Sequence, residues 1–193
     1  MKILPFLIIV LTSLNSFGQI PEFDSNVNES VEDQSYLFKK FYPEYEFILG
    51  YTQKSFWFKR QEYSVLTFNG TDWELKKWSY ELKEEKPKKS KMKSRILVKE
   101  KVINLLNYFE SKGFYSLNQD LLNWSKKDLG NGTMLHQSIM DGVFETFEFI
   151  SSSGHRIYSA HEPVQKQEFV YIEQREIFLD CLDKFLDLID ETK

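Results

Sequence analysis

The feature that most constrains the fold is a pair of hairpin dipeptides, each placed between stretches rich in aromatic and β-branched residues. Asn69-Gly70 separates residues 62–68 from 73–82, and Asp141-Gly142 separates residues 133–140 from 143–151. Dipeptides of this kind favour tight turns whose central residues have positive φ, and such turns join antiparallel strands. The sequence therefore predicts two antiparallel meanders, over residues 45–82 and 133–161.

The first hairpin also predicts which side chains share a sheet face. A loop of two residues and a loop of four residues have the same parity. Either loop therefore places four apolar residues on one face: Leu66, Phe68, Trp73 and Leu75. Beyond Leu75 the apolar positions shift to Trp78, Tyr80 and Leu82. One extra residue at Lys76-Lys77 would produce this shift, so a β-bulge is predicted there.

Two amphipathic helices are predicted, one after each meander. In residues 97–111 apolar side chains recur every three or four positions, and Gly113 fits the left-handed position that closes a helix. Residues 171–190 carry a second broad apolar stripe. The order of strands, helix, strands and helix predicts an α+β fold, in which antiparallel β-meanders carry both helices on one face.

Two segments lack any periodic pattern. Residues 84–95, EEKPKKSKMKSR, could form an anion-binding or membrane-surface loop. A solvated connection is favoured instead, because no aromatic or amphipathic pattern accompanies the lysines. Residues 19–35 are acidic and polar and are predicted to be a flexible lead. Residues 36–193 are predicted to form a single α+β domain.

The first 18 residues have the pattern of a secretory signal peptide. Lys2 precedes an apolar run over residues 3–14, and Ser16-Phe17-Gly18 supplies the small residues of a cleavage site. The run is shorter than the ~20 apolar residues that span a bilayer, so a retained anchor is the less favoured alternative. We therefore expect an exported protein, periplasmic or extracellular in a bacterium, with no stable membrane insertion after cleavage.

The second meander contains all three histidines of the chain: His136, His155 and His161. A two-residue turn at Asp141-Gly142 would place His136 diagonal to Glu145, and a three-residue turn over 152–154 would place Glu145 opposite His161. That row could hold a transition metal or act as an acid–base pair, so these three residues are the candidate catalytic and metal-ligating set. The competing interpretation is a solvated cross-strand charge pair. A two-residue turn would reverse the faces of the last strand, and His155 beside the turn is predicted to be solvated.

Familiar catalytic and cofactor motifs are absent from the sequence. It has no P-loop, no nucleophile elbow, no zinc-protease motif, no dinucleotide fingerprint and no Cys-x-x-Cys pair, so no cofactor is predicted. The net charge of −4 disfavours nucleic acid as a partner. The single cysteine, Cys181, excludes an internal disulfide and is predicted to be buried on the second helix. The four tryptophans could form a carbohydrate platform, but core positions are favoured for most of them, with Trp73 and Trp78 on one inner face.

The segment E-S-K-G-F-Y-S-L at residues 110–117 is followed by strands, a proline and a terminal amphipathic helix. This arrangement resembles that of uncharacterised secreted proteins of Gram-negative bacteria. The Ser-Phe-Gly-Gln sequence at the predicted cleavage site is similar to that of flavobacterial signal peptides. The resemblance implies export and brings no active site with it.

These features favour an exported, non-enzymatic binding module, such as an inhibitor or an immunity-type protein, whose ligand is a protein or a small molecule. The alternative is a metal-dependent or acid–base hydrolase that uses His136, Glu145 and His161. A structural envelope protein is the third hypothesis. An exposed apolar or aromatic patch would favour binding, whereas convergence of the three side chains in a pocket would favour hydrolysis.

Overall fold

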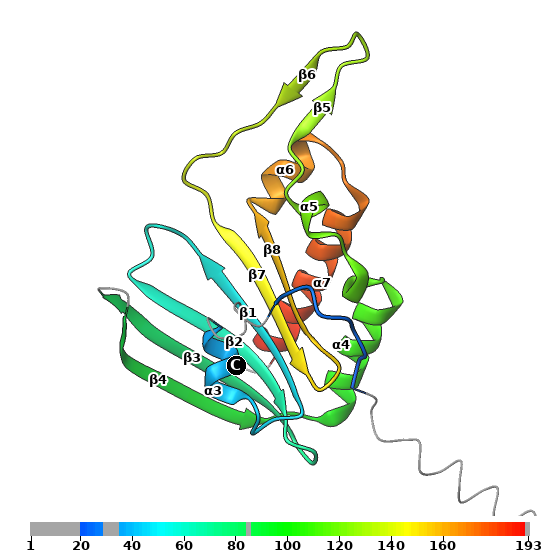
Figure 1. The fold of residues 1–193 in the computed structure, drawn as a ribbon. Coiled ribbons are helices and arrows are strands. Elements are labelled where there is room, and N and C mark those ends of the chain that lie inside the picture. The colour runs from blue at the N-terminus through cyan, green and yellow to red at the C-terminus, as the bar shows by residue number, and fades with distance from the viewer. Residues whose placement is uncertain (1–19, 29–34, 84–85, 192–193) are drawn as a thin grey trace, which may run out of the picture.

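A six-stranded antiparallel sheet forms the centre of the computed structural model, which describes residues 20–28, 35–83 and 86–191 (Figure 1). The strand order is β4-β3-β2-β1-β7-β8. These strands are β1 Phe47–Lys54, β2 Arg60–Phe68, β3 Trp73–Lys83, β4 Lys86–Ile96, β7 Phe144–Ser151 and β8 His155–His161. Two short strands, β5 Lys126–Asp128 and β6 Met134–His136, pair only with each other.

Helices cover both faces of this sheet. Within the described ranges they are α3 Tyr36–Phe41, α4 Lys99–Ser111, α5 Gln119–Leu122, α6 Pro163–Phe169 and α7 Glu173–Asp190, with a 3₁₀ turn η1 at Phe114–Ser116. The predicted α+β class is confirmed, and α4 and α7 are the two predicted helices. Both pack on the same face (Figure 1). Gly113 has a φ of 70°, as a left-handed helix terminator requires.

The larger core lies between the sheet and α4, η1 and α7. Phe114 of η1 is fully buried, and its ring centroid lies 5.4 Å from those of Phe147 and Tyr158. The first hairpin contributes the residues that were predicted to share a face: Leu66, Trp73 and Leu75 are buried in this core and Phe68 packs against it. Cys181 is also buried here, and burial raises the pKa of its thiol to about 12, so it behaves as a small apolar residue.

The smaller core lies on the opposite face, beneath α3. Leu37 and Phe41 of this helix pack with Trp78 and Tyr80 of β3. Gly50 of β1 permits the close approach, because a Cβ at that position would overlap the Leu37 side chain. The helix begins at Ser35, whose hydroxyl accepts a hydrogen bond from the Phe38 amide at 3.0 Å.

The β-bulge predicted at Lys76-Lys77 is wrong. The pairing of β2 with β3 is continuous from Phe68–Trp73 to Arg60–Glu81, and the irregularity in β3 lies toward β4, between Ser79 and Glu81. Trp73 faces the larger core and Trp78 faces the smaller one, so these two buried tryptophans do not share an inner face. Because β3 is buried on both faces, its apolar residues can switch from odd to even positions without any bulge. The first set faces the larger core and the second set faces the smaller core.

The connection predicted over residues 84–95 is also wrong, because β4 occupies Lys86–Ile96 and pairs with β3. Residues 84–85 lie outside the described ranges. An edge strand needs only one partner, and lysines on such an edge are common because they prevent pairing with other chains. One contact that holds β4 in place is the hydrogen bond from Ser94 to Glu74 of β3.

Glu74 provides a prediction about acid stability. Hydrogen bonds from Lys76 and Ser94 lower the pKa of Glu74, and Lys76 is only 3% exposed. We expect Glu74→Gln to lower the free energy of unfolding by about 2 kcal/mol at neutral pH, because it leaves a buried ammonium without its anion. A carboxylate with a lowered folded-state pKa stabilises the protein above its unfolded pKa of ~4.3, and this contribution is lost as the pH falls through the folded value.

Urea unfolding of the wild type and of Glu74→Gln at neutral pH and at about pH 3 tests this prediction. The difference between the two proteins should shrink in acid. A difference that does not change with pH would contradict the assignment.

Residues 20–28 are anchored to the domain by buried side chains and hydrogen bonds, in contrast to the predicted flexible lead. Phe23 is 6% exposed and belongs to the larger core. The side-chain amide of Asn26 exchanges two hydrogen bonds with the backbone of Ile157, both at 2.8 Å. The amides of Gln119 and Asn123 bind the β8 backbone farther along. At this edge of the sheet, side chains therefore make hydrogen bonds to backbone groups of β8 that a further strand would otherwise pair with.

Residues 19 and 29–34 and the predicted signal peptide over 1–18 lie outside the described ranges. In the part of the chain that the structure describes, no helix is long and apolar enough to cross a membrane.

Candidate functional site

The second meander differs from its prediction in two ways. β6 pairs with β5 instead of β7, so no hairpin forms through Asp141-Gly142. The β7–β8 turn has two central residues, since the Ser151 amide bonds to the Gly154 carbonyl at 3.0 Å. Phe144 therefore pairs with His161, and Glu145 pairs with Ala160. This is the shorter-turn alternative, and it shifts the last strand by one residue.

The shift separates the candidate catalytic and metal-ligating residues. Glu145 and His161 sit at neighbouring positions of the pairing and point to opposite faces of the sheet. Glu145 accepts hydrogen bonds from Tyr51 at 2.7 Å and from Gln53 at 3.0 Å. The His161 ring stacks on Phe144 with centroids 4.5 Å apart, and burial, followed by the charge of Lys166, lowers its pKa.

His136 is exposed on β6, away from this pair. Among the described residues, no group of three or more His, Cys, Asp and Glu side chains is placed to hold a metal ion. The predicted cluster of His136, Glu145 and His161 is therefore not formed.

His155 is buried, contrary to its prediction. It is 1% exposed, its Nε2 lies 2.9 Å from Glu148 Oε1, and its ring stacks on Phe38. The Ser35 hydroxyl donates to the same carboxylate oxygen. The carboxylate lies between serine and histidine, whereas nucleophilic catalysis needs the imidazole in that place. This buried cluster therefore fastens α3 to β7 and β8.

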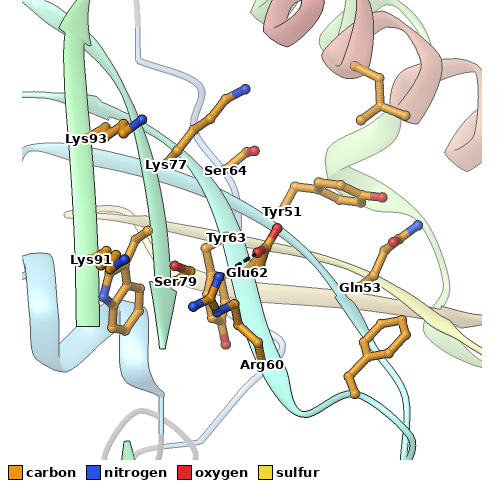
Figure 2. A pocket seen from close by; sticks show the side chains of 13 residues that line it. Tyr51, Gln53, Arg60, Glu62, Tyr63, Ser64, Lys77, Ser79, Lys91 and Lys93 are labelled. Carbon is orange, nitrogen blue, oxygen red and sulfur yellow. Dashed lines mark ion pairs between the residues drawn. The ribbon is translucent and has the colours of Figure 1, made fainter. Parts of the chain in front are cut away.

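A different feature of the sheet offers a site. A hollow of about 720 Å³ lies across β1 to β4 on the face that α4 and α7 cover (Figure 2), and Phe58 and Leu186 are among its lining residues. We call it the basic hollow. Its polar side chains are Tyr51, Gln53, Arg60, Glu62, Ser64, Lys77, Ser79, Lys91 and Lys93. The volume falls in the range of ligand sites, about 300–1,000 Å³.

Strand alternation builds the basic hollow. Leu66 of β2 lies in the larger core, and the next residues on its face are Ser64, Glu62 and Arg60. The helix layer covers the apolar part of this face and leaves the polar part open. On the neighbouring strands Lys77 pairs with both Ser64 and Lys93, and Ser79 pairs with Lys91.

The electrostatics of the basic hollow oppose those of the whole chain. Four cations, Arg60, Lys77, Lys91 and Lys93, accompany one carboxylate, Glu62, in a chain with a net charge of −4. Arg60 and Glu62 lie 3.9 Å apart and are well exposed, so their ion pair is weak. Among the described residues, no ion pair involves the three lysines. Lys77 directly opposite Lys93 is an unfavourable cross-strand pair that an anion would relieve.

Tyr51 lies at the margin of the basic hollow and keeps its proton. Burial raises its pKa, and the hydrogen bond to Glu145 raises it further. Tyr51 and Gln53 thus both bind Glu145, the one predicted site residue that lies close to the basic hollow.

Comparison with protein-family models, curated proteins and solved structures found no match to this chain. Its function has to be inferred from the site.

The chemistry of the basic hollow suits binding. The lysine, arginine and serine side chains that line it are suited to hold anions. The sequence carried a signal for this site. Lys91 and Lys93 alternate with Met92 in a strand-like period of two, within the segment for which an anion-binding interpretation was set aside.

Proposed function

We propose that this protein is an exported, non-enzymatic binding module that holds an acidic segment of another protein in the basic hollow. The observation that carries the proposal is the opposed pair of Lys77 and Lys93, in a hollow that Lys91 and Arg60 also line and in which Glu62 is the one carboxylate. Burying the acidic side chains of a partner against these cations would relieve their mutual repulsion.

The spacing of the cations favours an extended chain over a single small anion. Neighbouring strands lie about 4.8 Å apart, and residues two positions along a strand lie about 6.7 Å apart. Lys77, Lys91 and Lys93 are therefore spread over the floor of the basic hollow instead of meeting at one point (Figure 2). Several carboxylates on one extended segment match this spread, and the hydroxyls of Ser64 and Ser79 can add hydrogen bonds.

Two further features support a binding role outside the cytoplasm. The signal-peptide pattern of residues 1–18 predicts export. Burial of hydrophobic side chains on both faces of the sheet provides a rigid platform without disulfides. A rigid platform with a charged recognition surface suits an inhibitor or an immunity-type protein, because complementary charge speeds association with the partner.

The test uses the mature chain and a fluorescein-labelled peptide of alternating glutamate and aspartate. We expect Lys77→Glu/Lys91→Glu/Lys93→Glu to weaken peptide binding at least tenfold, because three attractive charges become repulsive. Lys77→Gln/Lys93→Gln should give a smaller loss of the same sign. Wild-type binding should weaken as salt is raised, since exposed charges are screened. Fluorescence anisotropy measures each affinity.

The matched control is Lys39→Glu/Lys40→Glu/Lys127→Glu, which changes the net charge equally at exposed positions away from the basic hollow. It should retain most of the affinity. Equal losses in both triple variants would show that only overall charge matters, and the absence of peptide binding by the wild type would refute the proposed ligand.

A further inference from the structure

The turn between β1 and β2 exposes three consecutive aromatic side chains. Phe56, Trp57 and Phe58, here called the aromatic tip, are 89%, 64% and 36% exposed. The Phe58 amide bonds to the Ser55 carbonyl at 3.2 Å, which closes the turn. The rings of Phe56 and Trp57 contact each other with centroids 5.2 Å apart. None of the three belongs to either core.

Exposure of this kind needs a reason. Soluble proteins rarely expose contiguous large apolar side chains unless the patch binds something. Close to the aromatic tip, Lys54 at the end of β1 pairs with Phe144 of β7, a further aromatic residue that is 41% exposed.

Basic residues flank the aromatic tip. Lys54 precedes it and Lys59 and Arg60 follow it, and all three are exposed. Arg60 pairs directly with Glu81 of β3, whereas among the described residues no ion pair involves Lys54 or Lys59. Glu62 lies 3.9 Å from Arg60, and Glu145 accepts hydrogen bonds from Tyr51 and Gln53. β4 also begins at this end of the sheet, since Lys88 pairs with Glu81 and Glu81 pairs with Arg60.

We infer that the aromatic tip inserts into the headgroup region of an anionic phospholipid bilayer and holds the protein on the membrane surface. Tryptophan and phenylalanine favour the boundary between headgroups and acyl chains. Lys54 and Lys59 have long stems that keep their ammonium groups at the phosphates while the rings enter. Attraction of such cations to anionic lipids adds to the apolar contribution. The contact is peripheral and lies next to the basic hollow without using its lysines.

Trp57 is the reporter for the test. Trp73 and Trp78 are 2% and 5% exposed, so in a Trp124→Phe background Trp57 is the exposed tryptophan of the described chain. Vesicles of phosphatidylglycerol and phosphatidylethanolamine in equal parts should shift its emission to shorter wavelength and protect it from acrylamide. Vesicles of phosphatidylcholine alone should give a much smaller change.

Sedimentation with the anionic vesicles measures binding by the full mature chain. We expect Phe56→Ser/Trp57→Ser to reduce the partition coefficient at least tenfold, and Lys54→Gln/Lys59→Gln to reduce it about tenfold at low salt. The control Ile96→Ser/Val98→Ser removes two side chains that are 70% and 62% exposed, and it should bind as the wild type does. Ile96 pairs with Glu74, at the opposite end of the sheet.

Three results would overturn the inference. They are no binding to anionic vesicles, binding that leaves Trp57 as accessible to acrylamide as in solution, and an unchanged partition for Phe56→Ser/Trp57→Ser. Loss of vesicle binding in this variant should leave binding of the acidic peptide intact, so failure here is distinct from failure of the proposed function. A further outcome is that the wild type binds another protein and not the vesicles. If Phe56→Ser/Trp57→Ser then loses that protein binding, the aromatic tip contacts a protein partner and the membrane inference is refuted.

Discussion

Replacing Arg175 by methionine is expected to lower the free energy of unfolding by about 4 kcal/mol. Arg175 is fully buried near the start of α7. Its guanidinium donates to the carbonyls of Leu122 and Val170, each at 3.0 Å, and to that of Trp124. Methionine fills much of the volume but leaves these carbonyls without a donor.

The arrangement explains why a buried cation is tolerated. Leu122 ends α5 and Val170 caps α6, and both contribute carbonyls that helix geometry leaves without partners. The negative ends of helices favour a positive charge. Burial lowers the pKa of Arg175, yet arginine remains charged in proteins.

Urea unfolding monitored by circular dichroism tests the Arg175 prediction. Arg175→Lys keeps the charge but not the planar set of donors, so its loss should be intermediate. The matched control, Arg95→Met, removes an exposed arginine of β4 and should change stability by less than about 0.5 kcal/mol. A loss of under about 1 kcal/mol for Arg175→Met would contradict the role assigned to the guanidinium.

Removing the Glu148 carboxylate should destabilise the protein by about 3 kcal/mol. Glu148 is 8% exposed and receives the Ser35 hydroxyl and the His155 ring at the same oxygen, Oε1. Glu148→Leu would leave both groups buried without this acceptor. The loss should appear first at α3, because Ser35 also caps that helix.

Three measurements distinguish the stability contributed by the hydrogen bonds of Glu148 from that of general core packing. Urea unfolding of Glu148→Leu gives the total effect. Ser35→Ala should cost only about 1 kcal/mol, the usual value of a helix cap. The double variant Glu148→Leu/His155→Leu should recover part of the stability, since a buried polar pair is replaced as a unit. Additive losses in the double variant would mean that the two side chains do not interact.

Hydrogen exchange locates the effect. The amide of Phe38, which bonds to Ser35, should exchange faster in Glu148→Leu, while amides of α4 keep their protection. Uniform loss of protection would indicate global destabilisation without a local role.

Local patterns predicted the two long helices, α4 and α7, and the first hairpin well. The apolar period of residues 97–111 and Gly113 located α4 to within two residues at its start, and residues 171–190 located α7 equally well. At the first hairpin, a loop of two or four residues gave the same faces. The loop has four residues, since Phe68 pairs with Trp73, and the prediction did not depend on that choice.

The candidate site failed where one residue of register decided the outcome. At residues 152–154, a loop of two residues and a loop of three residues turn the side chains of β8 toward opposite faces of the sheet. Gly154 favoured the three-residue loop, which is not the one that forms. The shorter loop is favoured by packing, because it places Tyr158 and Ala160 in the larger core. The same choice buries His155 beneath Phe38, and α3 was not expected to cover that face.

The alternation of Lys91 and Lys93 was the one sequence signal for the basic hollow. The hollow as a whole could not be predicted, because its residues come from four strands and none of these strands has a binding motif by itself. Arg60 and Glu62 precede the first hairpin, Lys77 follows it, and Lys91 and Lys93 lie in the segment that was taken for a connection. Only the pairing of β4 with β3 brings Lys93 opposite Lys77. The aromatic tip could have been predicted, because the sequence shows three consecutive aromatic residues between basic residues.

The sequence by itself determined the α+β class, the two long helices and the antiparallel direction of the hairpins. These depend on periodicity and turn chemistry, which act over a few residues. Tertiary structure decided the strand order, the β7–β8 register, the capture of β4 at the edge and the cover of α3 on the second face. Those choices depend on which arrangement buries the most apolar surface while pairing every strand, and contacts between segments far apart in the chain settle that.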